Sequence, residues 1–340
     1  MKKVSICAVL MTICMIIAAV PAFAESTADR YGTPDKTIVT APRFTATEGK
    51  GPVIKTQPED VTVSYPEGAS FHVEVEDPDN VASYQWIMHD KVDNEFILSG
   101  ITAKTDTVVI PSTVREHGIL RFSCVVTDKE GNVTISDEGS LDIDNRDVIK
   151  PVFYVGEYAV EPGEKLDLET VDIGGGHKLG KGSVEFDSNG TDITLTDLDY
   201  DNTYVTCDLA ATSNVALSME YYMPDEEEYN VYFVGNNRIY NSYYDYDYNV
   251  GGIPFDFYFI GEGDKPLVNF KGNGSLEITN GSIALRVIGD LMVDIDITLK
   301  QDKKLYADGI SANNLMIAQG NNINMEVYGS ALYATGNIYV

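Results

Sequence analysis

Short runs of apolar residues recur along most of the chain, and they alternate with polar residues instead of following the 3.6-residue period of an amphipathic helix. The segments VTVSY (61–65) and FHVEV (71–75) alternate in this way on either side of the turn Pro66-Glu67-Gly68. Alternation with period 2, interrupted by Gly, Asn and Asp, is typical of short β-strands. The pattern predicts an all-β protein.

Residues 52–144 contain the first group of predicted strands. After the two above, the apolar runs SYQWIM, DTVVIP, ILRFSCVVTD and SLDI follow at short intervals, separated by turn residues such as Lys129-Glu130-Gly131-Asn132. Short strands at this spacing favour a β-sandwich. The segments around Gln85-Trp86 and RFSCVVTDKEGN (121–132) resemble the immunoglobulin-like fold of bacterial surface proteins.

The resemblance to immunoglobulin-like domains has consequences for the core. Cys124 corresponds to the second core cysteine of that fold, and Phe122 lies two residues before it, where a corner tyrosine is common. A valine, Val73 or Val75, stands where the partner cysteine is expected. The resemblance therefore implies that Trp86 packs against Cys124 and valine, with no disulfide bond.

Residues 1–24 have the pattern of a secretory signal peptide. Lys2 and Lys3 form a basic start, residues 4–20 are apolar, and Ala22-Phe23-Ala24 is a small-residue cleavage motif. We therefore expect a secreted, extracellular protein that does not insert into a membrane after cleavage. Association with the cell surface stays open.

Charge and cysteine content narrow the class of protein further. The chain has 24 Lys and Arg against 53 Asp and Glu, a formal net charge of −29. Removal of residues 1–24 takes away two lysines and leaves 22 basic against 53 acidic residues, or −31. Such a surface disfavours nucleic acid and anionic lipid as partners. Only Cys124 and Cys207 remain after cleavage, and each is expected to pack as a small buried hydrophobic residue.

Two segments flank the predicted sandwich. Residues 25–51 are polar, show neither the strand nor the helix period, and are predicted to be a disordered spacer. Residues 145–182 are predicted to be a junction, with the domain boundary at Lys150-Pro151. The glycine-rich GGGHKLGKG (174–182) does not follow a strand and open a helix, so it does not predict a phosphate-binding loop.

Residues 183–340 change to a loose repeat of turn and strand. The three-residue strands LEI, LMV, LMI and IYV start at positions 276, 291, 315 and 338, which places them 15 to 24 residues apart. Strands this short need neighbouring coils to supply their hydrogen bonds, which predicts a parallel β-solenoid. Asn313, Asn321 and Asn337 are expected at its corners. An antiparallel sandwich has similar strand spacing and stays an alternative.

Several longer segments support the same interpretation. GSVEFDSNGTDITLTDLDYDN, VYFVGNNRI, ADGISANNLMI and GSALYATGNIYV resemble an opening coil, a Gly-x-Asn coil and later coils of secreted gut-bacterial proteins with a right-handed parallel β-helix, often labelled carbohydrate-binding-domain proteins. The resemblance implies a β-helix over residues 183–340 and a carbohydrate ligand. Such proteins usually carry more coils, and this sequence stops on a strand at Val340, so an incomplete C-terminus stays an alternative.

The stretch NRIYNSYYDYDYNVGG (237–252) is the strongest candidate for a binding site. It lies between two strand-like runs and is expected to project as a loop. A tyrosine ring packs on the C–H groups of a sugar while its hydroxyl forms hydrogen bonds. Contact with an extracellular glycan is therefore predicted for Tyr243, Tyr244, Tyr246 and Tyr248. The alternative is a hydrated surface loop.

Carboxylate clusters raise the alternative of a calcium site. The candidates are Asp245 with Asp247, Asp294 with Asp296, and the segments 77–80 and 225–228. None of these has the ligand spacing and central glycine of a calcium-binding loop. Solvated charge clusters are favoured, and no metal or cofactor is predicted. Asp294 and Asp296 are expected to point outward from VDIDI, alternating with its inward apolar residues.

No catalytic constellation is apparent in the sequence. The histidines lie in the sandwich or the junction without a metal-binding signature around them; they are His72, His89, His117 and His177. No G-x-S-x-G motif is present. The leading prediction is a non-catalytic extracellular protein that recognises a glycan through the loops of the β-helix. The alternatives are a structural or adhesive surface module with a protein partner, and a β-helix enzyme that degrades polysaccharide.

Overall fold

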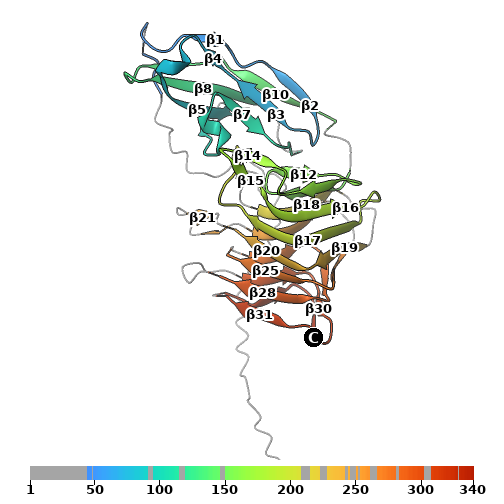
Figure 1. Cartoon of the computed structure of the whole chain (residues 1–340). Helices are drawn as coiled ribbons and strands as arrows, with labels where there is room; N and C mark the ends of the chain where they lie inside the picture. Colours follow the sequence, from blue (N-terminus) through green and yellow to red (C-terminus); the bar gives the residue numbers. More distant parts are fainter. Residues whose placement is uncertain are drawn as a thin grey trace, which may run out of the picture.

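The computed structural model describes residues 44–47, 49–90, 95–114, 119–145, 150–207, 215–222, 228–241, 244–245, 250–251, 253–260, 266–280, 283–301, 308–327 and 329–340. Regular structure in these ranges consists of β-strands and two single-turn 3₁₀ helices, η1 (Pro78–Asn80) and η2 (Thr102–Lys104). The expected all-β class is confirmed. Figure 1 shows a sandwich next to one end of a stack of strands. No helix in the described ranges is long and apolar enough to span a membrane.

The N-terminal sandwich is built from ten strands of the described chain. One sheet has the order β2–β10–β8–β5–β6 with β9 beside β8, and the pairs β3–β7 and β1–β4 make up the other layer. Strand β10 runs parallel to β2, whereas β5 and β8 are antiparallel. The strands are β1 (Ile54–Thr56), β2 (Val61–Ser64), β3 (Ala69–His72), β4 (Glu74–Val75), β5 (Val81–His89), β6 (Glu95–Ile97), β7 (Thr107–Ile110), β8 (Leu120–Asp128), β9 (Val133–Ile135) and β10 (Gly139–Asp144).

The core of the sandwich contains the residues that the sequence placed there. Trp86 and Cys124 are paired across β5 and β8, and both side chains are fully buried. Val73 belongs to the same apolar cluster, and the rings of Phe71 and Phe122 stack with centroids 4.7 Å apart. Cys124 is a free thiol. The predicted packing of tryptophan, cysteine and valine without a disulfide is confirmed.

Residues 150–207 connect the sandwich to the stack and form the first layer of the stack. Strand β11 lies antiparallel to both β12 and β18. Strands β16 and β17 form a hairpin, and β17 continues past a bend to pair with two later strands, β19 and β20. The strands are β11 (Val152–Val155), β12 (Tyr158–Val160), β13 (Lys165–Asp167), β14 (Asp172–Gly174), β15 (His177–Lys178), β16 (Gly180–Phe186) and β17 (Asp192–Asp201).

From β18 onward the chain passes repeatedly through three ladders of parallel strands. The first ladder is β18 (Val215–Tyr222), β23 (Ile253–Ile260), β26 (Ile283–Val287), β29 (Asp308–Ala312) and β32 (Leu332–Ala334). The second is β19 (Glu228–Val234), β24 (Leu267–Gly272), β27 (Asp290–Val293), β30 (Leu315–Ile317) and β33 (Ile338–Tyr339). The third is β20 (Asn236–Tyr240), β25 (Ser275–Thr279), β28 (Asp296–Lys300) and β31 (Ile323–Glu326).

The register of the second ladder explains the irregular spacing seen in the sequence. Leu291, Leu315 and Ile338 are direct partners in neighbouring coils, 24 and 23 residues apart. Leu276 belongs to the third ladder instead, where its next partner is Ile297. Treating all four short strands as equivalent was therefore wrong for Leu276. These ladders are parallel, so the antiparallel sandwich does not describe them.

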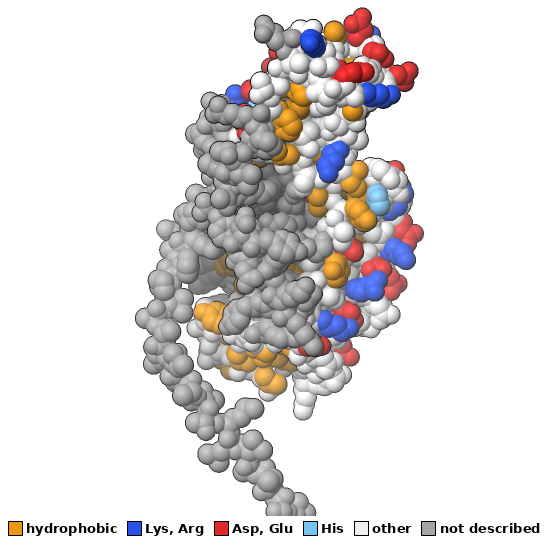
Figure 2. All heavy atoms as spheres, turned by 90° about the vertical axis from the view of Figure 1, so that its left-hand side faces the viewer, with side chains coloured by type: hydrophobic (Ala, Val, Ile, Leu, Met, Phe, Trp, Pro, Cys, Tyr) orange, Lys and Arg blue, Asp and Glu red, His pale blue; other side chains and the backbone are white. Residues whose placement is uncertain are grey.

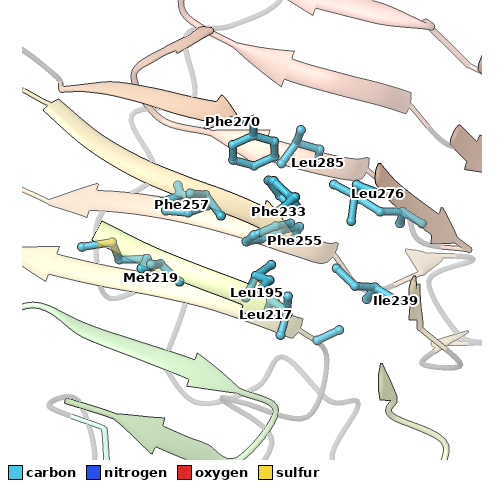
Figure 3. Close-up of a cluster of buried hydrophobic side chains, with 14 of the residues drawn as sticks. Leu195, Leu217, Met219, Phe233, Ile239, Phe255, Phe257, Phe270, Leu276 and Leu285 are labelled. Atoms are coloured by element: carbon cyan, nitrogen blue, oxygen red, sulfur yellow. The ribbon is translucent and has the colours of Figure 1, made fainter. Parts of the chain in front are cut away.

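The interior of the stack is aromatic near the sandwich and aliphatic farther along. Phe233, Phe255, Phe257 and Phe270 are fully buried, and the rings of Phe255 and Phe270 are 5.3 Å apart. Figure 3 shows these rings from adjacent ladders pointing toward one another, with Leu195, Leu217, Leu276 and Leu285 around them. Inward residues of the later coils are mainly Leu, Ile and Val. Burying such a continuous column of apolar side chains is the main stabilising contribution to the stack.

Glycine, asparagine and aspartate occupy the corners between ladders. Asp197 has a φ of 46° at the bend of β17, and Gly235 has a φ of 69° in the next coil. A side chain on Gly235 would lie 2.0 Å from Asp197 Oδ1, so only glycine fits this corner. The three asparagines expected at corners all lie between strands, as predicted: Asn313, Asn321 and Asn337.

Candidate binding surface

The tyrosine-rich stretch lies at the corner where the third ladder returns to the first. Twelve residues separate β20 from β23 there, whereas three separate β25 from β26, seven separate β28 from β29, and five separate β31 from β32. Within the stretch, β21 (Tyr244–Asp245) pairs antiparallel with β22 (Val250–Gly251). Figure 1 shows β21 projecting to one side of the stack. The long insertion is thus a loop between coils, as the sequence indicated.

Of the predicted contact residues, only the backbone of Tyr244 is described. Tyr243, Tyr246 and Tyr248 lie outside the described residues, as does Asp247. The predicted glycan contacts at these four tyrosines therefore stay predictions.

A buried amide pair fixes the position from which the tyrosine-rich loop leaves the stack. Asn241 follows β20 and is 1% exposed; its Oδ1 accepts a hydrogen bond of 2.9 Å from Asn202 Nδ2. The backbone N–H of Asn241 donates to the carbonyl of Thr279 in the next coil, and that of Asn202 donates to Tyr240. Paired amides of this kind are satisfied only in one register. These hydrogen bonds tie the residue at the base of the loop to both neighbouring coils.

Ion pairs cover the outer face of the third ladder beside that loop. Arg238 binds the carboxylate of Asp199 through three hydrogen bonds of 2.7 to 2.9 Å, and Lys300 Nζ lies 2.9 Å from Glu277 Oε1. The partners come from different coils. These cations are thus matched with acids, and Figure 2 shows Lys and Arg side chains interspersed with Asp and Glu side chains along one side of the stack.

The outer face of the second ladder begins with a column of asparagines that bond to each other and to carboxylates. Asn230 Nδ2 donates to Asp192 (2.8 Å), and Asn269 Nδ2 donates to both Asn230 (3.2 Å) and Glu228 (2.7 Å). Next to it, Lys271 Nζ lies 5.0 Å from the centre of the Tyr232 ring, a cation–π distance. The amide hydrogen bonds tie successive coils together.

The first ladder carries a buried ion pair on its outward side. Asp256 is fully buried, although it alternates with the inward Phe255 and Phe257. Arg286, its partner in the next coil, donates from Nε (3.0 Å) and from its terminal nitrogen (2.9 Å) to the two carboxylate oxygens. The guanidinium also lies 5.8 Å from the ring centre of Tyr258.

The acidic clusters that raised the calcium alternative take part in ordinary hydrogen bonds where they are described. Asp294 and Asp296 point outward as expected, while the apolar residues beside them are buried. Asp294 accepts from Asn321 Nδ2, and Asp296 accepts from the backbone N–H of Asn322. In the described ranges, no group of three or more His, Cys, Asp or Glu side chains is arranged to hold a metal ion.

The described histidines are dispersed. His89 is buried and bonds Ser123 Oγ at 2.9 Å, and His72 bonds Thr107. His177 stacks on Tyr204 with ring centres 4.2 Å apart, and Tyr204 remains 52% exposed. His117 lies outside the described residues. Sequence reasoning missed the stacked pair because its two rings are far apart in the chain and neither belongs to a repeat.

Comparison with known proteins gives similarities to solved structures that cover about a third of the chain. No protein-family model and no curated protein matches the chain. Among solved structures, the titin I-band fragment I67–I69 is 12% identical with a TM-score of 0.20, covering 35% of this chain and 53% of the fragment. Extracellular domains 3–5 of Drosophila OTK are 13% identical with a TM-score of 0.22, covering 38% of this chain and 44% of that one.

Similarities at these TM-scores carry no functional argument, and the chain spans about half the length of the titin fragment. The strand order of the N-terminal sandwich matches that of the immunoglobulin fold. The buried pair of Trp86 and Cys124 also occupies the positions typical of that fold. The N-terminal sandwich is immunoglobulin-like.

Proposed function

We propose that this chain is a secreted, non-catalytic binding protein whose C-terminal half is a parallel β-helix. The proposed ligand is a neutral extracellular glycan, held by the tyrosine-rich loop between β20 and β23. The three parallel ladders, visited in a fixed order with in-register partners, support the assignment of a β-helix.

The observation that carries the proposed function is the placement of the tyrosines. The insertion between β20 and β23 is longer than the corresponding interval in each later coil and contains a short hairpin. It holds four tyrosines, Tyr243, Tyr244, Tyr246 and Tyr248. Rigid scaffolds commonly carry their contact residues on such insertions. The base of this one is fixed by the buried amide of Asn241. Aromatic rings and hydroxyl groups without net positive charge suit a neutral sugar better than a polyanion.

The proposal of secretion rests on the first 24 residues. Their basic start, apolar run and Ala22-Phe23-Ala24 motif form the pattern of a cleaved signal peptide. A net charge of −29 is compatible with work outside the cell on an uncharged ligand.

Affinity electrophoresis of residues 25–340 against a panel of neutral polysaccharides tests this proposal. We expect retardation by at least one polysaccharide, and weaker retardation for the double variant Tyr244→Ala with Tyr246→Ala. The matched control is Tyr339→Ala, which removes a tyrosine that is 57% exposed in the last coil, far from the loop; it is expected to bind as the wild type does.

Two outcomes would replace the proposed function. Failure of every polysaccharide to retard the wild-type protein, together with capture of a defined protein partner, would favour an adhesive module. Release of reducing ends or unsaturated uronates from a polysaccharide would make the protein an enzyme. Equal retardation of wild type and the double variant would move the site away from this loop.

A further inference from the structure

The sandwich and the stack share a strand. Along β11, side chains alternate between two cores: Val152 and Tyr154 belong to the apolar cluster of the sandwich, whereas Phe153 and Val155 belong to that of the stack. Tyr154 is 2% exposed, and its hydroxyl donates to the carbonyl of Thr113 at 3.1 Å. Because one face of β11 is buried in each core, separating the two domains would expose apolar side chains of this strand.

Each domain also inserts a residue into the core of the other. Cys207 follows the first long strand of the stack, but its fully buried side chain belongs to the cluster around Trp86. In return, Ile101 of the sandwich packs against the apolar cluster of the stack. The two cysteines, which the sequence indicated to lie in different domains, therefore contribute to one core.

The backbone around Cys207 is hydrogen-bonded to the sandwich. The segment 203–207, which we call the strap, lies beside residues 100–102. Ile101 N donates to Val205 O, and Thr102 N donates to Thr206 O, both at 2.9 Å. Thr102 Oγ1 donates to the same Thr206 carbonyl at 2.7 Å. These hydrogen bonds run from the beginning of η2 to the carbonyl groups of the strap.

This close approach needs a glycine at position 100. A Cβ atom on Gly100 would lie 2.5 Å from the backbone carbon of Cys207. Contacts of that length with backbone atoms cannot be relieved by a side-chain rotation. Any side chain at position 100 would therefore push the strap away from the sandwich.

A buried carboxylate holds the strap from the other side. Glu157, in the turn between β11 and β12, is 5% exposed and accepts hydrogen bonds from the backbone N–H groups of Thr206 (2.6 Å) and Cys207 (3.2 Å). Tyr158 Oη lies 2.8 Å from Thr206 Oγ1. Charge-assisted bonds to backbone donors are stronger than neutral ones. The strap is thus fixed between Glu157 and the loop of residues 100–102.

We propose that the sandwich is the folding cap of the stack, and that the strap makes the two domains one cooperative unit. A column of coils exposes unpaired strand edges and apolar side chains at its first layer unless something covers them. Here β11, the strap and Ile101 close that layer, and the sandwich core is in turn completed by Tyr154 and Cys207. The sandwich is accordingly a structural part of the stack.

Urea unfolding of residues 25–340 with two local probes tests this proposal. Trp86 is the only tryptophan in the chain and reports on the sandwich. Hydrogen exchange of peptides from β25 and β28 reports on the stack. We expect the two midpoints to coincide. We also expect Leu141→Ala, a truncation in the sandwich core outside the strap and its hydrogen-bond partners, to lower both midpoints equally.

Variants at the contacts of the strap, Gly100 and Glu157, distinguish loss of coupling between the two domains from general destabilisation of the protein. Gly100→Val is expected to split the transitions, with tryptophan fluorescence changing at lower urea than exchange in the stack. Where that variant does not fold, Glu157→Gln is measured instead. It keeps the side-chain volume, removes the charge, and is expected to split the two transitions in the same way. Three results would each overturn the proposal. They are separate midpoints in the wild type, an effect of Leu141→Ala confined to tryptophan fluorescence, and coinciding midpoints in Gly100→Val or Glu157→Gln.

Discussion

Arg286 binds both carboxylate oxygens of Asp256 from the neighbouring coil, and Asp256 is fully buried at that contact. A geometrically similar pair, Arg238 with Asp199, lies on the exposed face of the third ladder. The two pairs share chemistry and differ in burial, so they allow a direct comparison. Burial makes the loss of one partner costly because the remaining charge is left in a low-dielectric environment.

The first prediction uses this comparison. Arg286→Leu should lower the free energy of unfolding by about 3–5 kcal/mol, because it removes the cation from a buried carboxylate. Arg238→Leu should lower it by less than about 1 kcal/mol, because its pair is exposed to water. Urea unfolding measures both. Adding Asp256→Asn to Arg286→Leu should restore part of the stability. Equal losses for the two arginine variants would show that burial of Asp256 has no energetic consequence.

The second prediction concerns an inward-facing amide at a corner of the stack. Asn237 is 1% exposed and links three coils: its Oδ1 accepts from Leu198 N (3.0 Å), and its Nδ2 donates to the carbonyls of Val234 (3.2 Å) and Ser275 (3.3 Å). Asn237→Ala should cost roughly 3 kcal/mol, since buried backbone groups lose their partners. The exposed neighbour variant Asn236→Ala should change stability by less than about 0.5 kcal/mol. Similar unfolding midpoints for the two variants would contradict the bridging role.

Features of the fold and of the candidate site could be predicted from the sequence where they depend on residues close together in the chain. Alternation with period 2 predicted the strands, and the segment around Trp86 and Cys124 predicted the sandwich core. Corner asparagines such as Asn313 were predicted because asparagine is typical of turns, where its side chain can form hydrogen bonds. These features are local, and each is visible within a few residues.

Interactions between distant residues left no such signal. The strap bonds Thr102 to Thr206, which are 104 residues apart, and Glu157 carries no motif that distinguishes it from the other acids. The assignment of Leu276 to its ladder failed for a related reason: coils of unequal length bring short strands of like sequence onto different faces. The tyrosine-rich loop was recognisable from its composition and from the strand-like runs on either side, whereas the ladders that it connects could be assigned only from the register of the strands.

The third prediction is a pH dependence at the turn between β16 and β17. Burial alone raises the pKa of Asp187, but hydrogen bonds from the backbone N–H groups of Asp192, Thr191 and Asn189 outweigh it and hold the pKa below its ordinary value of 3.8. A carboxyl group with a lowered pKa stabilises the fold above the unfolded-state pKa, and this contribution is lost as pH falls through the folded-state pKa.

Asp187→Asn should therefore be less stable than the wild type at neutral pH, and the difference should shrink as the pH drops below about 4. Urea unfolding at a series of pH values measures this. A stability difference that stays constant or grows on acidification would contradict the proposed hydrogen bonding of Asp187.

The central claim is that the short strands of the C-terminal half stack in parallel register. Met292 and Met316 are direct partners on the outer face of the second ladder, where neighbouring strands are about 4.8 Å apart. Met292 and Thr298 lie on different ladders, but an antiparallel hairpin would bring them close together. The native Cys124 and Cys207 are buried, so spin labels can be directed to introduced cysteines.

The most direct measurement is the electron paramagnetic resonance spectrum of two doubly labelled variants, Met292→Cys with Met316→Cys and Met292→Cys with Thr298→Cys. Parallel stacking predicts strong dipolar broadening for the first pair and much weaker broadening for the second. Broadening of the second pair without broadening of the first would contradict the stack, and with it the position of the tyrosine-rich loop.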